Sequence, residues 1–136
     1  MRFFTRSWSE GELSDAEFEA AISDYRDHVA TLLDRLSAPL RRLATDLSMH
    51  DAIVKNVQRA ERSLSLSLRV GDRQRGYFDL DLRYEDVSSL RGMAAVGSEV
   101  LQDEVDIDDD GAFVHRFLFD VGEMVVSFRD VTLHAS

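Results

Sequence analysis

Two runs of strictly alternating side chains constrain the fold of this chain more than any other feature. Leucines alternate with serines in Ser63–Val70, read SLSLSLRV, and apolar residues alternate with charged ones in Tyr77–Tyr84, read YFDLDLRY. A period of two places one set of side chains on each face of a strand, so each run predicts a half-buried β-strand. The polar stretch Gly71–Gly76 between them is typical of a turn, and we expect an antiparallel hairpin.

Other segments with strand character lie on both sides of this hairpin, whereas residues 86–98 are ambiguous because Gly92 and Gly97 interrupt them. Turns are expected at Asp108–Gly111 and at Val121-Gly122. The additional predicted strands are Ile53–Val57, Val100–Ile107, Ala112–Asp120 and Met124–Leu133.

The first third of the chain has helical periodicity instead. Ser14-Asp15-Ala16-Glu17 is a capping box and predicts a helix from there to about Leu36. Pro39 is tolerated in a first turn and opens a shorter helix to about Leu47. Together these patterns predict an α+β fold in one domain, 1–136. An N-terminal helical pair, at about 15–47, packs on an antiparallel sheet at about 53–134, a meander of about five or six strands.

Composition excludes several classes of protein. The chain has 136 residues and no cysteine, so disulfides, thiolate catalysis and sulfur-ligated zinc sites are excluded. The N-terminal residues lack the apolar region and cleavage site of a signal peptide, so none is expected, and the apolar runs of about four residues are far shorter than a membrane span requires. These features predict a soluble, cytoplasmic protein with no cofactor.

Charge is distributed unevenly. The net charge is −10, and residues 99–136 carry 10 acidic and 2 basic side chains, against 16 and 14 in residues 1–98. This distribution argues against binding to nucleic acid or to anionic membranes and allows a cationic partner. A solvated acidic rim that only aids solubility is the alternative. The candidate residues for contact with a basic partner are Asp103, Glu104, Asp106, Asp108, Asp109 and Asp110.

The stretch D-I-D-D-D-G within this acidic segment has two interpretations. Asp106, Asp108 and Asp110 stand at positions 1, 3 and 5 of a calcium loop, with Gly111 at position 6. Position 12 is Phe117, where such a loop needs a bidentate Glu, and the flanking residues alternate like strands. Asp-Gly between two alternating runs is a strong hairpin signal. We therefore favour a hairpin tip, with metal binding as the alternative.

His50-Asp51 could form a general base with its orienting carboxylate, but adjacent residues rarely achieve that geometry. A local role is favoured, in which Asp51 or Ser48 caps backbone groups and His50 bonds to a neighbouring carbonyl. Asp79 and Asp81 share one strand face and could bind Mg²⁺, although a solvated sheet face is the simpler explanation and is favoured. We therefore assign no catalytic residue.

Two predictions concern aromatic neighbourhoods. His115 falls on the strand face that carries Phe117, so we expect a hydrogen-bonded histidine in the core. Phe3, Phe4 and Trp8 are expected to anchor the N-terminal segment.

Three segments carry a resemblance to a known family. They are Phe3–Trp8, read FFTRSW, Leu47–Ala52, read LSMHDA, and the closing Glu104–Phe128 with its aromatic and acidic residues. Together they resemble an uncharacterised bacterial family of small proteins, known as a domain of unknown function. The resemblance implies a single-domain bacterial protein and no activity, so no site residue is transferred from it.

Two functions remain open at this point. The first is a non-enzymatic protein-binding module whose acidic C-terminal sheet surface meets a basic partner, as immunity proteins and inhibitors do. The alternative is a Ca²⁺- or Mg²⁺-binding module, or a metal-dependent hydrolase, that uses Asp106, Asp108 and Asp110 or the group of His50, Asp51, Asp79 and Asp81. The chain is either a monomer or a homodimer, because exposed edge strands can pair between copies.

Overall fold

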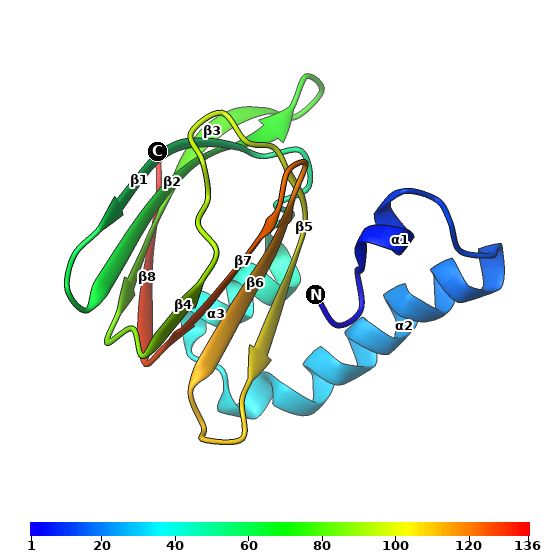
Figure 1. The fold of residues 1–136 in the computed structure, drawn as a ribbon, viewed down its shortest axis with the longest axis horizontal. Coiled ribbons are helices and arrows are strands. Elements are labelled where there is room, and N and C mark those ends of the chain that lie inside the picture. The colour runs from blue at the N-terminus through cyan, green and yellow to red at the C-terminus, as the bar shows by residue number, and fades with distance from the viewer.

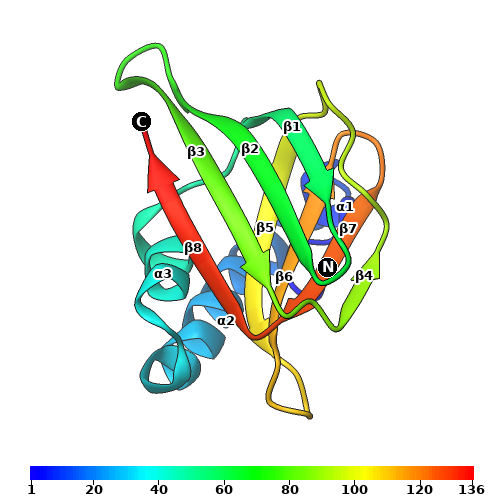
Figure 2. The same ribbon diagram turned by 90° about the vertical axis from the view of Figure 1, so that its left-hand side faces the viewer.

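The strands of this protein form two antiparallel sheets that face each other, in a computed structural model that describes residues 1–136 (Figure 1). Sheet A has the strand order β1-β2-β3-β8 and sheet B the order β4-β7-β6-β5. Figure 2 looks onto sheet A, with β5, β6 and β7 behind it. The strands are β1 (Ile53–Arg59), β2 (Ser63–Asp72), β3 (Gly76–Glu85), β4 (Ser89–Arg91), β5 (Val100–Ile107), β6 (Phe113–Phe119), β7 (Glu123–Phe128) and β8 (Asp130–Ala135).

The hairpin predicted from the two alternating runs is confirmed as β2 and β3. Leu66 pairs with Leu82 and Leu68 with Leu80, and these four side chains are buried between the sheets. The serines of β2 and the charged residues of β3 take the opposite, outer face of sheet A. Alternation with a period of two therefore set both the strand positions and the buried face.

The predicted strand Met124–Leu133 is wrong, because the structure divides it between two sheets. Met124 and Phe128 are buried in β7, whereas Val131 is buried in β8. The buried positions thus change from even to odd numbers across Arg129, which one regular strand cannot accommodate. The chain leaves sheet B there and β8 pairs with β3 in sheet A. With this division and the short β4, the strand count is eight and exceeds the expected five or six.

The helices agree with the α+β prediction. Ser14 and Glu17 form the predicted capping box, and Pro39 lies in the first turn of the second predicted helix. That second helix continues from α-helical into π-helical geometry, and none of the helices combines the length and apolarity needed to cross a membrane. The helical elements are α1 (Arg6–Ser9), α2 (Asp15–Leu32), η1 (Leu33–Arg35), α3 (Ala38–Arg41) and η2 (Arg42–Asp46).

The helices cover only part of the sandwich. α3 contacts β8 and η2 contacts β5, so this helical segment lies beside the space between the two sheets. In α2 only Val29 and Leu32 are buried, and the N-terminal half of the helix projects away from the sheets (Figure 1). The N-terminal segment supports that half, since the Trp8 ring stacks on Phe18 at 4.6 Å between centroids. Phe4 and Trp8 are buried, which confirms their predicted anchoring role.

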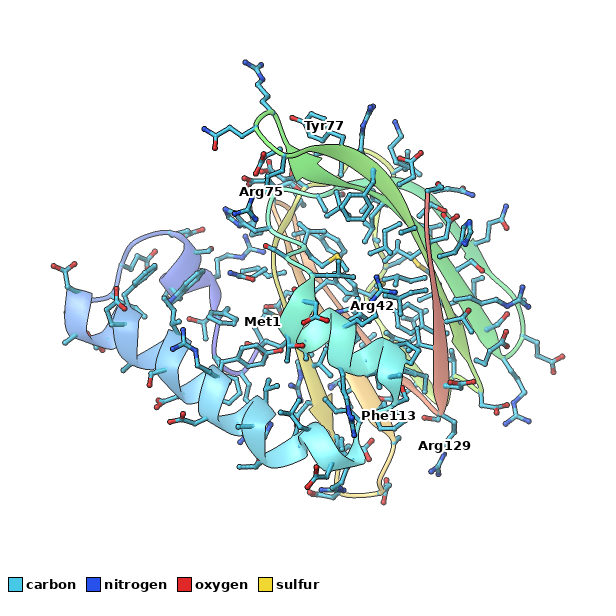
Figure 3. All side chains as sticks on the ribbon, turned by 180° about the vertical axis from the view of Figure 1, so that it is seen from behind. Met1, Arg42, Arg75, Tyr77, Phe113 and Arg129 are labelled. Carbon is cyan, nitrogen blue, oxygen red and sulfur yellow. The ribbon has the colours of Figure 1, made fainter.

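The core is a cluster of 23 buried residues contributed by both sheets and by the helical segment that ends in η2. Side chains fill the space between the sheets, as Figure 3 shows from behind. Tyr77 and Arg75 lie at one end of the molecule in that view, and Phe113 and Arg129 lie at the other. Each end of the sandwich therefore presents its own set of turns and side chains.

The free edge of β5 is closed by side chains. The backbone N–H of Val105 donates to the Tyr25 hydroxyl of α2 at 2.9 Å, and the N–H of Ile107 donates to the Asp106 carboxylate at 2.8 Å. Burial, and next the charge of Asp103, raise the pKa of Tyr25 far above its ordinary value. Tyr25 therefore stays a neutral hydroxyl that fixes α2 to the strand edge.

Candidate functional site

Glu104 is fully buried on the outer face of β5, under the N-terminal segment. Its carboxylate accepts the backbone N–H groups of Arg2 at 2.8 Å and of Phe3 and Phe4 at 2.7 Å each. Arg116 on the neighbouring strand lies 3.7 Å away and compensates the charge. A carboxylate predicted to face a partner is thus used inside the molecule, where it holds residues 2–4 against the sheet.

Asp106 extends the same internal network. It accepts from the His28 ring at 2.8 Å and from the guanidinium groups of Arg116 at 3.0 Å and Arg2 at 3.3 Å. Burial alone would raise the pKa of Asp106, but the hydrogen bonds from His28, the Ile107 N–H and Arg116 outweigh it, and the pKa is lowered. Asp106 therefore links α2, the N-terminal segment and β6 as an ionised group.

Asp103 points the other way, into the core. Its carboxylate contacts His115 Nε2 at 2.7 Å, and His115 Nδ1 lies 2.7 Å from the Tyr84 hydroxyl. His115 and Tyr84 are both fully buried, so this polar chain crosses the space between the two sheets. Burial raises the pKa of Tyr84, and the charge of Asp103 adds to the effect. The prediction of a hydrogen-bonded core histidine at position 115 is confirmed.

Asp108, Asp109 and Asp110 form the tip of the β5–β6 hairpin, as the Asp-Gly signal predicts. The Asp108 carboxylate accepts the backbone N–H groups of Asp110 and Ala112 at 2.9 Å each, which closes the turn. Gly111 has φ 82°, a conformation that glycine adopts without strain. Asp109 and Asp110 are exposed. The last two carboxylates are therefore free for contact, whereas Asp108 has a structural role.

No group of three or more acidic or histidine side chains is arranged to hold a metal ion. Asp106 is occupied by its bonds to His28 and Arg116, and Asp108 by its turn, so they do not converge with Asp110 on one point. Asp81 lies on the exposed face of sheet A, where its carboxylate accepts from the Ser67 hydroxyl. The two carboxylate sets proposed for a metal are thus not brought together.

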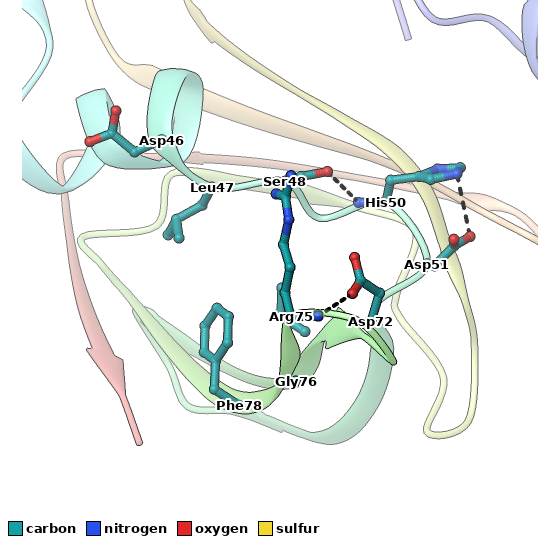
Figure 4. Close-up of a pocket in the computed structure, with 11 residues that line it drawn as sticks. Asp46, Leu47, Ser48, His50, Asp51, Asp72, Arg75, Gly76 and Phe78 are labelled. Carbon is teal, nitrogen blue, oxygen red and sulfur yellow. Dashed lines mark hydrogen bonds and ion pairs between the residues drawn. The ribbon is translucent and has the colours of Figure 1, made fainter.

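His50 and Asp51 line a polar hollow of about 400 Å³ between the segment after η2 and the β2–β3 turn (Figure 4). His50 Nδ1 donates to the Leu101 carbonyl at 2.7 Å, as predicted, and Nε2 lies 3.4 Å from Asp51. Ser48 Oγ accepts from the His50 backbone N–H at 3.4 Å. Arg75 extends from the β2–β3 turn into the same hollow. The histidine ring is thus committed to Leu101, and Ser48 is not paired with it as a nucleophile would be.

Asp51 also belongs to an acidic group at the start of β5. The Glu99 N–H donates to Asp120 Oδ1 at 3.2 Å, and the Asp120 N–H donates to the Glu99 carbonyl at 2.9 Å. The pKa of Glu99 is raised, first by its hydrogen bond with Asp51, then by partial burial and by the charges of Asp51 and Asp120; His50 opposes them. Three carboxyl groups are therefore crowded at an exposed surface.

Exposed apolar side chains lie on the segments next to this acidic group. The loop before β5 is bonded to β1, since the Val54 N–H donates to the Ser98 carbonyl and the Gly97 N–H to the Val54 carbonyl. Four of the five large apolar side chains that are exposed lie on these segments and on the β6–β7 turn. We call the combined surface the apolar–acidic patch; it consists of Ile53, Met93, Val96, Val121, Asp51, Glu99 and Asp120.

The β5–β6 tip lies at the opposite end of sheet B from the β6–β7 turn and the start of β5, in both Figure 1 and Figure 2. In a comparison with protein families, the model for the protein of unknown function DUF4085 matches residues 2–130. The chain belongs to the DUF4085 family. No curated protein and no solved structure matches it.

The DUF4085 match covers the segments on which the resemblance rested. The structure shows that two of them are in contact, because Phe3 and Phe4 bond to Glu104 at the start of the closing segment. The patch and the Tyr84–His115 contact were not anticipated from the sequence. Their members are scattered over distant segments, and isolated apolar residues in loops give no periodic signal.

Proposed function

We propose that this DUF4085 protein is a non-enzymatic binding module that meets a basic protein partner through the apolar–acidic patch. The observation that carries the proposal is the gathering of exposed apolar side chains around three crowded carboxyl groups. Val96 and Val121 are 68% and 83% exposed, whereas large apolar residues elsewhere in the fold are mostly covered. Exposed large apolar side chains grouped with polar ones are typical of protein interfaces.

The charges of the patch favour a cationic partner over a neutral one. The hydrogen bond with Asp51, then burial, and then repulsion from Asp51 and Asp120 raise the pKa of Glu99. A lysine or arginine of the partner would relieve that repulsion and form charge-assisted hydrogen bonds. The same acids disfavour anionic partners, in keeping with the net charge of −10.

Asp109 and Asp110 contribute at longer range in this proposal. They are exposed at the opposite end of sheet B, outside the patch. Charges at the rim of an interface or beyond it mainly raise the association rate, whereas buried apolar anchors mainly slow dissociation. The two ends of the sheet are therefore expected to affect binding through different rate constants.

The test is affinity capture from the native host, followed by kinetics on the captured partner at several salt concentrations. We expect a basic protein whose dissociation rate rises roughly tenfold with Val96→Ser/Val121→Ser, since central apolar anchors dominate interface energies. The matched control is Asp109→Asn/Asp110→Asn, which should slow association and weaken its salt dependence while leaving dissociation unchanged.

Two results would contradict the proposal. One is a partner that is neutral or acidic and whose affinity is independent of salt. The other is unchanged dissociation in the Val96→Ser/Val121→Ser variant, with circular dichroism showing an intact fold. Both substitutions are on exposed loop positions, so they should alter the free energy of unfolding by less than about 0.5 kcal/mol.

A further inference from the structure

A second hollow lies between α2 and η2, on residues that are not part of the apolar–acidic patch. It has a volume of about 370 Å³, and seven of its nine lining residues are apolar. Small-molecule sites in proteins are concave, mainly apolar and of about this size or larger. The lining residues of this crevice are Phe4, Ile22, Tyr25, Arg26, Val29, Ala30, Leu33, Ala44 and Thr45.

The crevice exists because α2 does not rest fully on the body of the protein. Only Val29 and Leu32 of the helix are buried, while Ile22 and Leu33 remain half-buried on the same apolar stripe. Ala30 of the helix and Ala44 of η2 bring only methyl groups to the crevice and cannot fill it. The sequence thus supplies an apolar stripe that the fold leaves partly uncovered.

The polar groups of the lining are not equivalent. The Thr45 hydroxyl donates to the Arg41 carbonyl at 2.7 Å, and the Tyr25 hydroxyl holds the β5 edge. Arg26 makes no ion pair and no side-chain hydrogen bond, and no acidic residue lines the crevice. The one charged group of the lining is therefore the guanidinium of Arg26, an exposed residue, and guanidinium groups pair with carboxylates in a bidentate geometry.

We propose that this crevice binds a small amphipathic carboxylate, with its apolar body against Ile22, Val29 and Ala44 and its carboxylate paired with Arg26. An apolar hollow alone would accept neutral, cationic and anionic ligands equally. The free guanidinium in its lining selects the anion. Phe4 lines the crevice and its ring lies 4.8 Å from that of Trp8, the single tryptophan, so occupancy should change tryptophan fluorescence.

The experiment compares two probes of equal chain length, decanoate and decyltrimethylammonium, both below their micelle concentrations. The protein is titrated with each probe while Trp8 fluorescence and the methyl NMR signals of Ile22 and Val29 are followed. We expect saturable binding of decanoate, with shifts confined to the crevice methyls, and at least tenfold weaker binding of the ammonium probe. That ratio corresponds to one charge-assisted pair in a partly exposed site.

Three variants locate the site. Arg26→Gln should weaken decanoate roughly tenfold and leave the ammonium probe unchanged, as expected for the loss of one ionic hydrogen bond. Arg35→Gln removes the same charge from an exposed position outside the lining and should change neither affinity. Ala30→Phe, also at an exposed position, should fill the crevice and abolish binding of both probes.

The proposal is overturned if decanoate does not saturate, if both probes bind equally, or if Arg35→Gln weakens decanoate as much as Arg26→Gln does. Sedimentation velocity at rising protein concentration supplies one more test. A dimer that dissociates in the Ala30→Phe variant would show that a second copy of the chain occupies the crevice, and the ligand proposal would be wrong.

Discussion

Two neighbouring groups of aspartates and glutamates, on β5 and on the tip that follows it, have opposite environments. Glu104 and Asp106 are buried and bonded to the N-terminal segment, α2 and β6, whereas Asp109 and Asp110 are exposed and their carboxylates accept no hydrogen bond from the protein. All four side chains are carboxylates, and their positions lie within seven residues. What differs is the presence of donors from segments about 80 to 100 residues away in the chain.

The difference shows that acidic composition does not by itself mark an interaction surface. A carboxylate is stable inside a protein only when N–H groups and opposite charges replace its water. Glu104 has three backbone N–H groups and Arg116, so burying it fixes a segment instead of attracting a partner. The tip has no such donors, and its carboxylates keep their water.

The largest expected loss of stability comes from removing a carboxylate of the buried group. Glu104→Ala leaves the N–H groups of Arg2, Phe3 and Phe4 and the charge of Arg116 without a partner. We expect a loss of about 3–5 kcal/mol in the free energy of unfolding and a melting temperature about 10 °C lower. Urea and thermal denaturation would measure it, with Asp110→Ala as the control. A loss below about 1 kcal/mol would show that the network is not a stabilising contact.

Substitution of Asp106 should have the next largest effect on the free energy of unfolding, and this effect should depend on pH. Asp106→Asn should cost about 2 kcal/mol at pH 7, since it removes hydrogen bonds to a charged group. The folded pKa lies below the ordinary value of 3.8, so the stabilisation is complete above about pH 5 and is lost as the pH falls through the folded pKa. The difference between wild type and variant should therefore narrow on acidification toward pH 3. If the stability difference between wild type and variant widened toward pH 3, the pKa of Asp106 would be raised on folding and the predicted direction would be wrong.

Tyr84→Phe tests a third buried acid, Asp103, through the hydrogen bonds that connect Asp103 to His115 and His115 to Tyr84. Removal of the hydroxyl leaves His115 Nδ1 without its partner, and we expect a cost of about 1–2 kcal/mol. Tyr77→Phe, at an exposed tyrosine of the same strand, is the matched control and should be neutral. Equal costs in the two variants would mean that the Tyr84–His115 contact contributes nothing.

The smallest effects distinguish residues within the tip. Asp108→Ala removes the acceptor of the Asp110 and Ala112 N–H groups and should cost about 1 kcal/mol. Asp109→Ala should change the free energy of unfolding by less than about 0.5 kcal/mol. Both values come from chemical denaturation. If the two variants changed the free energy of unfolding equally, water would replace the hydrogen bonds of the turn without any loss of stability.

Much of the fold was predictable because its signals are local. The alternation of Ser63–Val70 specified a strand and its buried face, and Ser14 with Glu17 marked where α2 begins. The division at Arg129 was also visible in principle, as a change from even to odd buried positions. The many apolar residues in Met124–Leu133 nevertheless favour the prediction of a single strand.

The environment of the acidic residues was not predictable in the same way. Whether Glu104 is buried depends on residues 2–4, and no periodicity connects segments about 100 residues apart. The hollow at His50 and the apolar–acidic patch have the same origin, since each joins loops from separate parts of the chain. Sequence patterns report the elements well and their mutual contacts poorly.

The side chains that close the β5 edge have a consequence for aggregation. An edge strand with free N–H groups is a template for strands of other molecules. On β5 the outward N–H groups of Val105 and Ile107 already donate to Tyr25 and Asp106, so an incoming strand would have to displace α2 first. Any fibrillar or strand-exchanged assembly of this protein should therefore grow from one of the other edge strands, which are β1, β8 and β4. Of these, β1 is a poor template, because its pairing is irregular at Val54/Asn56 and it carries the charged Lys55.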